Sequence, residues 1–362
     1  MIDMEPRDEI REKIDSLDQR ILQALAERVS LAREIGQRKK RAGLSIIDVA
    51  REHAVLRRVI EKAGQLNLPE DGTEAVYREI MRLCRNVQMD QVRVGFLGPR
   101  GTFSEQAARE HFRDKNATFE ERPTVSDIFR SVKTNEVNIG VVPIENSNEG
   151  SVVITLDLLS ESNLMISGEI VLRVTHNLIV KPGTGLGDIV EVASHPQALA
   201  QCHHYLEENL PKAELLETKS TSAAVKLVAE RDGVAAIGTE LAAQIFGMHT
   251  IAFNIEDSQE NHTRFFVLGK EDSPPTGRDR TSVLFSVQHR PGSLQEALEV
   301  LSKRTINLTK IESRPSRGKP WEYVFFCDFE GHRKDQNCRE ALEELQLKTV
   351  NLKVLGSYPR AQ

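Results

Sequence analysis

VRVGFLGPRGTFSEQAAREHF, residues 92–112, marks the point where a purely helical pattern gives way to alternating strands and helices. A short run rich in β-branched and aromatic residues is followed by glycines, and Ser104 can then cap a helix. Strand-like runs recur further along, with helical runs between many of them, at 139–143, 178–180, 190–193, 234–238 and 264–268. This alternation predicts an α/β region over residues 92–271, with largely parallel sheets.

The residues before this point predict three helices and no strand. Apolar residues recur at the three-to-four spacing of one helix face over residues 8–41, and Gly43 stops that helix. A second helix is expected from about 48 to 64 and a third from 74 to about 91, with 68–72 as a turn. Residues 1–91 therefore form an all-α domain.

The residues after the α/β region predict a third, smaller domain. A polar Pro/Gly-rich linker covers 270–280, and the run from 281 to 358 then reads strand, helix, strand, strand, helix, strand. That order is typical of the ferredoxin-like α+β fold, which we assign to residues 280–362.

Composition and residue spacing argue against several classes of protein and of site. The 362 residues carry a net charge of −6, which argues against a general nucleic-acid binder. No apolar run reaches the roughly 18 residues that a membrane span needs, and the charged start lacks a signal peptide, so we expect a cytoplasmic protein. The four cysteines form no CxxC pair and the histidines show no metal-ligand spacing, so no metal site is expected.

Two basic residues share one face of the first predicted helix. Arg28 and Lys39 are eleven residues apart, close to three turns, with Ala32 and Ile35 between them. Basic side chains on a face that otherwise resembles a core face favour a dianionic ligand. Ordinary surface charge is the alternative, because residues 1–90 carry 17 basic and 17 acidic side chains.

Arg11 lies seventeen residues before Arg28 on the same helix. At ~1.5 Å per residue this is roughly 25 Å, too far for one small metabolite to contact both side chains. The two residues could meet across an antiparallel dimer in which each helix supplies Arg28 to one site and Arg11 to the other.

Residues 7–91 resemble the all-helical chorismate mutase domain. The matching stretches are IREKI at 10–14, LAERVSLAREIGQRKK at 25–40, DVAREHAVLRR at 48–58 and the helix around 78–88. The resemblance implies that Arg11 of a partner chain and Arg28 grip the carboxylates of chorismate, and that Lys39 and Gln88 hydrogen-bond its ether oxygen. It also implies that Asp48, Arg51 and Glu52 surround the ring hydroxyl and the backbone.

The implied rearrangement suits these residue types. A one-substrate rearrangement needs a held conformer and stabilisation of charge that develops on the ether oxygen, without a nucleophile. Arginine grips carboxylates bidentately, whereas lysine is a point donor. Where many members of the family have Ser, this chain has Cys84, whose thiol is a weaker donor, so we expect weaker help to a substrate carboxylate.

Four loops of the α/β region are rich in hydroxyl, amide and glycine residues. The first, 94–107, fits neither common nucleotide-binding pattern, and the others are 141–151, 193–202 and 218–228. Repeated helix capping is the alternative for each loop. In open α/β sheets, ligands bind beyond the carboxyl ends of the strands, which favours an anion site where such loops meet.

These loops, with TRF at 263–265, resemble prephenate dehydratase, whose fold has two α/β lobes similar to periplasmic binding proteins. The matches are GPRGTFSEQA (98–107), VPIENSNEG (142–150), SHPQALAQC (194–202) and STSAA (220–224). The resemblance implies that Thr263 is catalytic, as an oriented hydrogen-bond donor to the departing hydroxyl. Arg264 would hold a carboxylate, either structural or belonging to the substrate. Further candidate substrate-binding residues are Thr102, Asn146, Ser147 and Thr221.

Residues 281–358 resemble an ACT domain, a small amino-acid-sensing module. RPGSLQEAL at 290–298 and INLTKIESRP at 306–315 carry the resemblance, although Ser293 and Gln295 depart from the family's usual loop. By resemblance, phenylalanine binds between paired domains and inhibits the dehydratase, and a domain that only dimerises is the alternative. The implied effector residues are Gly292, Leu294, Asn307, Leu308, Glu312, Ser313 and Arg314.

Together the resemblances imply a homodimer or higher oligomer that converts chorismate to prephenate and prephenate to phenylpyruvate, without a cofactor. A non-catalytic sensor of an aromatic acid is the main alternative, and a DNA-binding regulator is a weaker one. The sensor hypothesis does not explain why one helical domain contains Arg11, Arg28, Lys39 and Gln88 together. It also does not explain why Thr263 occurs in TRF.

Overall fold

The computed structural model describes residues 5–315 and 323–361 and divides into two compact units. One unit holds the residues up to 92 together with 112–117, and the other holds the remainder. The extreme ends of the first and third predicted domains, and residues 316–322, lie outside the described residues. Among the described residues, no helix is long and apolar enough to cross a membrane.

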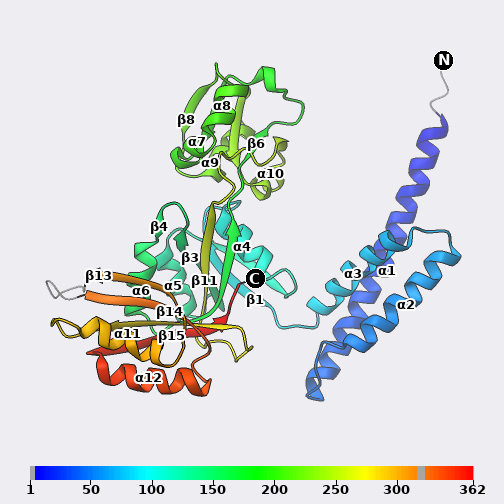
Figure 1. Ribbon diagram of the computed structural model, residues 1–362. Coiled ribbons are helices and arrows are strands. Elements are labelled where there is room, and N and C mark those ends of the chain that lie inside the picture. Colours follow the sequence, from blue (N-terminus) through cyan, green and yellow to red (C-terminus); the bar gives the residue numbers. More distant parts are fainter. Residues whose placement is uncertain (1–4, 316–322, 362) are drawn as a thin grey trace. The chain divides into compact units, whose positions relative to one another are not determined.

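The first unit contains the three predicted helices (Figure 1): α1 (Glu5–Arg41), α2 (Val49–Gln65) and α3 (Glu70–Asn86). The predicted turn at 68–72 is wrong in its second half, because α3 already begins there. Pro69 is the N-cap residue of α3, and Glu70 and Asp71 place negative charge in its first turn, which favours a helix start. The helix ends at Asn86, before the predicted limit of about 91.

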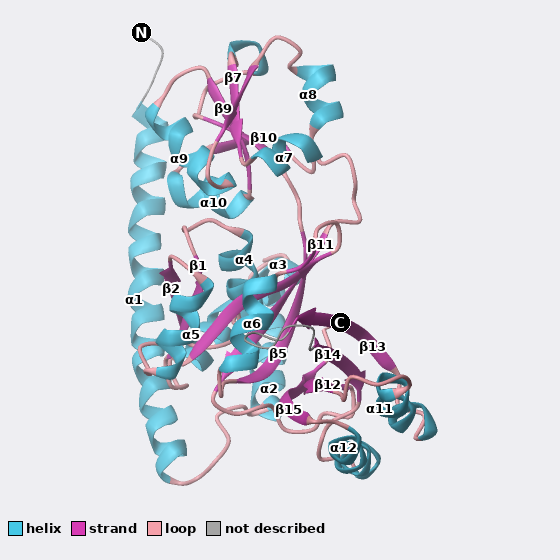
Figure 2. Ribbon diagram, turned by 90° about the vertical axis from the view of Figure 1, so that its left-hand side faces the viewer, coloured by secondary structure: helices cyan, strands magenta, loops and turns pink. Residues whose placement is uncertain are grey.

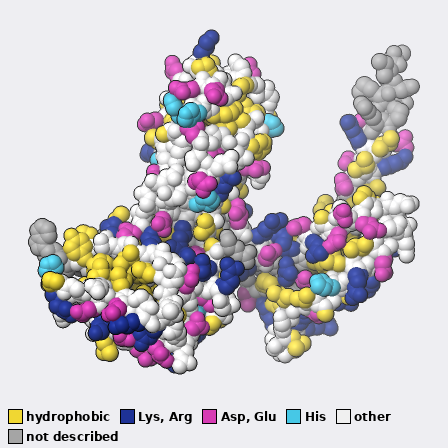
Figure 3. Space-filling model, in the orientation of Figure 1, with side chains coloured by type: hydrophobic (Ala, Val, Ile, Leu, Met, Phe, Trp, Pro, Cys, Tyr) yellow, Lys and Arg dark blue, Asp and Glu magenta, His cyan; other side chains and the backbone are white. Residues whose placement is uncertain are grey.

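A stripe of apolar side chains on α1 faces solvent. Its members recur at the spacing of one helix face and are each about half exposed: Ile10, Ile14, Leu17 and Ile21. Hydrophobic side chains are visible on the surface of this unit in Figure 3. Within one chain, this face of the helix is not buried.

The second unit begins with an α/β lobe. Its sheet has the order β2-β1-β3-β11-β5, with β4 paired to β3. The strands are β1 (Val92–Leu97), β2 (Ala117–Arg122), β3 (Ile139–Asn146), β4 (Gly150–Ser151), β5 (Met165–Arg173) and β11 (His262–Gly269). Its helices are α4 (Phe103–His111), α5 (Val125–Lys133) and α6 (Val153–Glu161). Since α4 begins at Phe103, Ser104 lies inside the helix and is not its cap.

A second α/β lobe has its own sheet, with the order β10-β6-β9-β7-β8. Its strands are β6 (Asn177–Val180), β7 (Glu191–Ser194), β8 (Glu214–Glu217), β9 (Val234–Gly238) and β10 (His249–Ala252). Its helices are α7 (Pro196–Gln201), α8 (His203–Asn209), α9 (Thr221–Glu230) and α10 (Glu240–Phe246), with a 3₁₀ turn, η1, at Leu186–Asp188. The predicted two-lobed architecture is confirmed.

Both sheets are mixed, so the expectation of largely parallel sheets is wrong. β1 pairs parallel with β3, and β7 pairs parallel with β8 and β9. β11 is antiparallel to both β3 and β5, and β6 is antiparallel to β9 and β10. The chain leaves the first lobe after β5 and returns along β11 (Figures 1 and 2), and a returning strand runs against its neighbours.

The last domain has the predicted ferredoxin-like order. Its elements are β12 (Asp279–Ser286), α11 (Ser293–Lys303), β13 (Leu308–Pro315), β14 (Tyr323–Glu330), α12 (Gln336–Lys348) and β15 (Asn351–Pro359). The antiparallel sheet has the order β13-β14-β12-β15, and α11 and α12 cover one face of it (Figure 1).

This domain shares a core with the first α/β lobe. Phe326, Leu355 and Tyr358 pack in one buried cluster with Ile166 and Phe266 of that lobe. The ring centroids of Phe266 and Tyr358 are 5.8 Å apart in an edge-to-face arrangement. The shared core explains why these two domains form a single compact unit.

Candidate active sites

A pocket of about 270 Å³ opens between the three helices of the first unit. Seven residues singled out from the sequence line it: Arg28, Lys39, Asp48, Arg51, Glu52, Cys84 and Gln88. The apolar part of the wall comes from Leu31, Ala32, Ile35, Ile46, Val55 and Met81. Arg85 also lines the pocket, so it holds four basic and two acidic side chains, an excess of positive charge suited to a dianion.

Local structure places these side chains. Asp48 caps α2 by accepting a hydrogen bond of 2.9 Å from the backbone N–H of Arg51, which fixes the start of that helix at the pocket. Gly36 lets α1 approach the end of α3, because a Cβ there would lie 2.7 Å from Cβ of Gln88. The amide of Gln88 follows the end of α3 and donates to the carbonyl of Cys84 at 2.8 Å.

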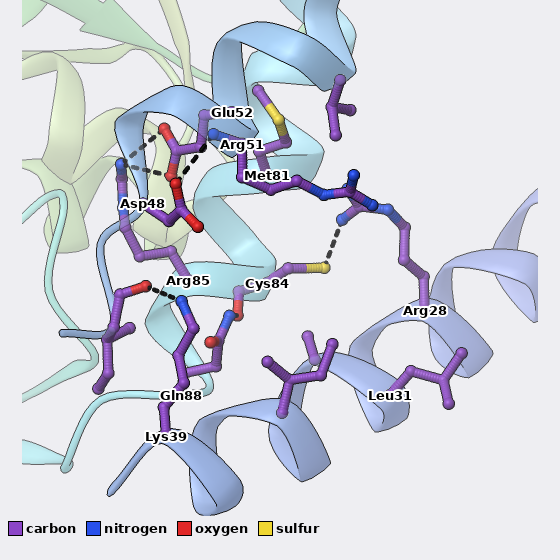
Figure 4. Close-up of a pocket in the computed structure, with 14 residues that line it drawn as sticks. Arg28, Leu31, Lys39, Asp48, Arg51, Glu52, Met81, Cys84, Arg85 and Gln88 are labelled. Atoms are coloured by element: carbon purple, nitrogen blue, oxygen red, sulfur yellow. Dashed lines mark hydrogen bonds and ion pairs between the residues drawn. The ribbon is translucent and has the colours of Figure 1, made fainter. Parts of the chain in front are cut away.

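The polar groups of the pocket meet from opposite sides (Figure 4). Arg28 Nη1 of α1 lies 2.7 Å from Cys84 Sγ of α3, and Lys39 Nζ donates to the carbonyl of Ile46 at 2.8 Å. Gln88 Oε1 is buried without a partner, and such an acceptor favours a ligand or water that donates to it. The donors of α1 and α3 therefore face one space.

Two residues depart from the sequence-based account of this pocket. Arg11 lies outside it, with 72% of its side chain exposed and Asp8 3.6 Å away. Arg85, near the end of α3, was missed, although its position three residues before Gln88 could have indicated it. Its guanidinium lies 3.4 Å from Glu52 and so orients an acidic group at the pocket wall.

A second cluster of polar side chains lies where β3 and β11 pair in the first α/β lobe. Thr263 is the register partner of Asn146. Asn146 Nδ2 donates to Thr263 Oγ1 at 2.9 Å and to Asn261 Oδ1 at 2.8 Å. Because the Thr263 oxygen accepts this bond, its own hydrogen remains available to a substrate.

Ser147 fixes the backbone beside this cluster. Its hydroxyl donates to the carbonyl of Glu260 at 3.0 Å and accepts from the N–H of His262 at 3.0 Å. It thereby ties the end of β3 to the segment that leads into β11.

Arg264 points into a buried ionic network. Its Nη1 lies 2.6 Å from Asp328 Oδ2 of β14, its Nε donates to Glu169 at 2.8 Å, and its Nη2 donates to the hydroxyl of Tyr358 at 3.1 Å. Burial opposes the charge of Arg264, but Tyr358, Asp328 and Glu169 outweigh it and raise its pKa. Of the two alternatives left open by the sequence, the carboxylates that Arg264 holds here are structural.

Thr102 lies in the loop after β1 of the first lobe, and Thr221 begins α9 of the second lobe. Thr102 Oγ1 donates to the carbonyl of Leu97 at 3.0 Å and so closes its own loop. The carbonyl of the adjacent Gly101 accepts a 2.6 Å bond from Thr239 of the second lobe. Thr221 is the first residue of α9, whose cap is Ser220.

The predicted effector residues lie at two ends of the last domain. Gly292 and Leu294 line a pocket of about 550 Å³ formed by the loop after β12. Gly292 caps α11 with a φ of 86°, a conformation that favours glycine. Asn307 and Leu308 lie at the start of β13, opposite the end of β14, whereas Glu312, Ser313 and Arg314 lie near the end of β13.

Side chains along β13 also contact the first α/β lobe. Lys310 Nζ lies 2.8 Å from Glu145 Oε2 and 2.9 Å from Ser151 Oγ, which in turn hydrogen-bonds Glu312. Arg314 Nη2 lies 3.6 Å from Asp157 of α6. Two of the predicted effector residues therefore contact the lobe that carries Thr263.

Three family models match successive parts of the chain. Chorismate mutase type II matches residues 10–89, prephenate dehydratase matches 94–273 and the ACT domain matches 281–346. The helical pocket lies within the first match, and the Thr263 cluster within the second.

Known proteins resemble both the whole chain and its larger part. A bifunctional chorismate mutase/prephenate dehydratase of Aquifex aeolicus is 43% identical over 99% of each chain. A prephenate dehydratase of Arthrobacter aurescens in complex with L-Phe is 35% identical, with a TM-score of 0.68 over 74% of this chain and 90% of that one. A structure described as a novel type of quorum-quenching acylase, GqqA, is 30% identical, with a TM-score of 0.68 over 74% of this chain and 97% of that one.

Since one fold hosts differently described activities, function must be argued from site residues and full-length similarity rather than from the fold. The helical pocket, the Thr263 cluster and the end-to-end match point the same way. The chain belongs to the bifunctional chorismate mutase/prephenate dehydratase family.

Proposed function

We propose that this chain catalyses two consecutive reactions, the rearrangement of chorismate to prephenate and the conversion of prephenate to phenylpyruvate. The observation that carries the first is that Arg28, Lys39 and Gln88, from two helices, line one pocket with an excess of positive charge. The observation that carries the second is the hydrogen bond from Asn146 to Thr263 at the end of β3.

In the helical pocket, the chain's own residues bind and orient a dianion. Arg28 would grip one carboxylate, and Lys39 and the free amide hydrogen of Gln88 would donate to the ether oxygen as its bond breaks. Asp48, with Glu52 held by Arg85, would accept from the ring hydroxyl. The apolar wall formed by Leu31, Ile35 and Val55 favours a compact conformer of the substrate.

At the Thr263 cluster, the hydroxyl hydrogen would be donated to the departing hydroxyl group of prephenate. The electron pair of the bond to the ring carboxylate moves into the ring as CO2 leaves. The pair of the breaking carbon–oxygen bond leaves with the oxygen, and the departing hydroxide becomes water by taking a proton from the solvent. A threonine hydroxyl is a very poor acid, so its contribution is an oriented hydrogen bond to developing charge. Thr102, Ser147 and Thr221 remain candidates for holding the substrate.

We also propose that the mutase requires a second copy of the chain. The exposed apolar side chains of α1, which continue from Ile10 through Ile21 to Leu22 and Leu31, would be covered by an antiparallel copy of the helix. Arg11 lies on this part of the helix with its side chain in solvent. An antiparallel pairing would bring it to the partner's Arg28 without any bend in the helix.

Phenylalanine is the proposed effector of the dehydratase. Because Gly292 and Asn307 lie at different ends of one ACT domain, a site that uses both calls for two paired domains. Lys310 and Glu312 contact the first lobe, and these contacts connect the ACT domain to the end of β3. Phenylalanine would have to bind the less active arrangement better than the active one.

Product analysis on the wild-type chain tests the proposal. Chorismate supplied alone should yield prephenate and then phenylpyruvate, and prephenate supplied alone should yield phenylpyruvate. A chain that binds prephenate or phenylalanine but converts neither substrate would be a ligand sensor instead.

A further inference from the structure

A series of hydrogen-bonded amides, with Asn261 buried at its centre, extends from Thr263 to a histidine that the sequence did not single out. Asn146 donates to Asn261 Oδ1 at 2.8 Å, and Asn261 Nδ2 donates to Gln201 Oε1 at 3.1 Å. The same Gln201 oxygen lies 2.9 Å from Nε2 of His176. Asn261 and His176 are only 3% and 2% exposed, so these groups have little access to water as an alternative partner.

The donor and acceptor of every hydrogen bond in this series follow from the contacts of Asn146. Asn146 Oδ1 accepts from the backbone N–H groups of Asn148 and Glu149, at 3.0 and 3.2 Å, so its NH2 group must face Thr263 and Asn261. Asn261 therefore presents its oxygen to Asn146 and its NH2 group to Gln201. The Gln201 oxygen then needs a donor on its other side, which is the N–H at Nε2 of His176.

His176 is held in place for this role. Its backbone N–H donates to Glu256 at 2.9 Å, and its ring packs edge-on against Phe103 with centroids 5.7 Å apart. Burial lowers the pKa of His176, although Gln201 and Glu256 oppose this, so the ring is favoured in its neutral form. Because the ring hydrogen is on Nε2, Nδ1 carries no hydrogen and needs no acceptor, and Nδ1 has no hydrogen-bond partner.

We propose that His176, through Gln201, is a positioning residue that holds Asn261 with its oxygen toward the NH2 group of Asn146, and so supports the geometry in which Asn146 donates to Thr263 and leaves the Thr263 hydrogen free for the substrate. This rests on the proposed dehydratase function of Thr263. His176 does not touch the substrate in this account; it fixes the orientation of a group that does.

The places of these hydrogen-bonded residues in the fold support the inference. His176 lies in the connection from β5 to β6, Asn261 lies just before β11, and Gln201 ends α7 of the second lobe. Both connections between the lobes are thus tied to the second lobe by polar contacts. The orientation of Thr263 then depends on how the lobes meet, and a shift of about 1 Å at a reacting group can cost roughly 100-fold in rate.

The test compares His176→Leu, which removes the donor, with His176→Gln, whose amide can still donate to Gln201. Dehydratase kcat and KM are measured for prephenate on the full chain. We expect His176→Leu to lower kcat about 10- to 100-fold with little change in KM, and His176→Gln to recover most of the loss.

His332→Leu is the matched control. His332 is also buried, with Nε2 2.9 Å from the carbonyl of Ser273, but it lies in the ACT domain. It should lose stability without the selective fall in kcat. An equal fall in kcat for His332→Leu, or no difference between His176→Leu and His176→Gln, would overturn the proposal.

A double-mutant cycle with Asn261→Leu covers the case in which His176→Leu does not fold, since the cycle can then be run with His176→Phe, which also lacks the donor. If His176 acts through Asn261, the second substitution adds almost nothing to the first, whereas independent structural damage would add. Additive losses overturn the inference. A wild-type chain that does not convert prephenate overturns the dehydratase assignment itself. If the wild type is active and Thr263→Ala is inactive, the dehydratase assignment holds, and a negative result for the His176 variants then counts against the positioning role alone.

Discussion

Arg264 Nη1, one residue beyond Thr263 on β11, lies 2.6 Å from the carboxylate of Asp328 on β14. The two side chains belong to different domains, and the carboxylate of Asp328 also accepts a hydrogen bond from Ser282. The strand that carries Thr263 is therefore joined to the effector domain by a buried ion pair as well as by a shared core.

Asp328→Ala should destabilise the second unit strongly. Removing Asp328 leaves the buried Arg264 with Glu169, which Arg280 shares, as its remaining close carboxylate, and takes the acceptor from Ser282. Breaking a buried ion pair in this way costs up to about 3–5 kcal/mol. Thermal or denaturant unfolding measures it. Asp232→Ala, which breaks the exposed pair with Lys181, is the control and should stay near wild type. Equal free energies of unfolding for the two variants would show that the Arg264 network does not stabilise the second unit.

Mixing two inactive mutase variants should restore activity. Arg11→Ala and Arg28→Ala each remove one carboxylate contact from every site of an antiparallel dimer. In a mixed dimer one site has both arginines and the other has neither, so random mixing recovers up to about a quarter of wild-type activity. The mutase assay is run after mixing and dissociation–reassociation. Absence of recovery from two folded, dimeric variants would contradict the shared site.

Lys310→Met should weaken inhibition by phenylalanine more than it weakens phenylalanine binding. It removes the contacts with Glu145 and Ser151 while keeping the length of the side chain. A coupling of about 1–3 kcal/mol corresponds to a 5- to 150-fold effect, so the half-inhibitory concentration should rise at least about fivefold. Calorimetry and the dehydratase assay give the two quantities. Lys303→Met, an exposed lysine of α11, is the control, and identical inhibition in both variants would exclude this route.

Cys84→Ser should improve the mutase modestly. A hydroxyl is a better hydrogen-bond donor than a thiol and still accepts from Arg28, which lies 2.7 Å from the sulfur. A net gain of about 0.5–1.5 kcal/mol corresponds to a two- to tenfold higher kcat/KM for chorismate. Cys338→Ser replaces a buried thiol outside the pocket and should leave the mutase unchanged. A lower kcat/KM for Cys84→Ser would mean that the larger sulfur is needed for packing.

The helical pocket was largely predictable because one short-range rule governs it. A spacing of eleven residues places Arg28 and Lys39 on one helix face whatever the rest of the chain does. Only the boundaries of the third helix were misplaced, at Pro69 and near Asn86. Helix ends depend on caps and on packing of the next segment, and these are weaker signals than periodicity.

The α/β region was predictable in its elements and not in its strand directions. Alternating strands and helices do not say where the chain crosses to a second lobe and returns, and that return makes β11 antiparallel. The partners of Arg264 lie 95 and 64 residues away in sequence, so no local pattern indicates them. Gln201, at the end of α7, and Asn261, just before β11, likewise carry no local signal of their contact, because they lie 60 residues apart in sequence.

The central claim is that one chain holds two separate active sites. Two variants, each expected to lose only one of the two activities, test it most directly. Chorismate consumption and phenylpyruvate formation from prephenate are measured for wild type, Arg28→Ala and Thr263→Ala. The account predicts that Arg28→Ala loses only the first activity and Thr263→Ala only the second, each by at least about 100-fold. Loss of both activities in either folded variant, or of neither, would contradict it.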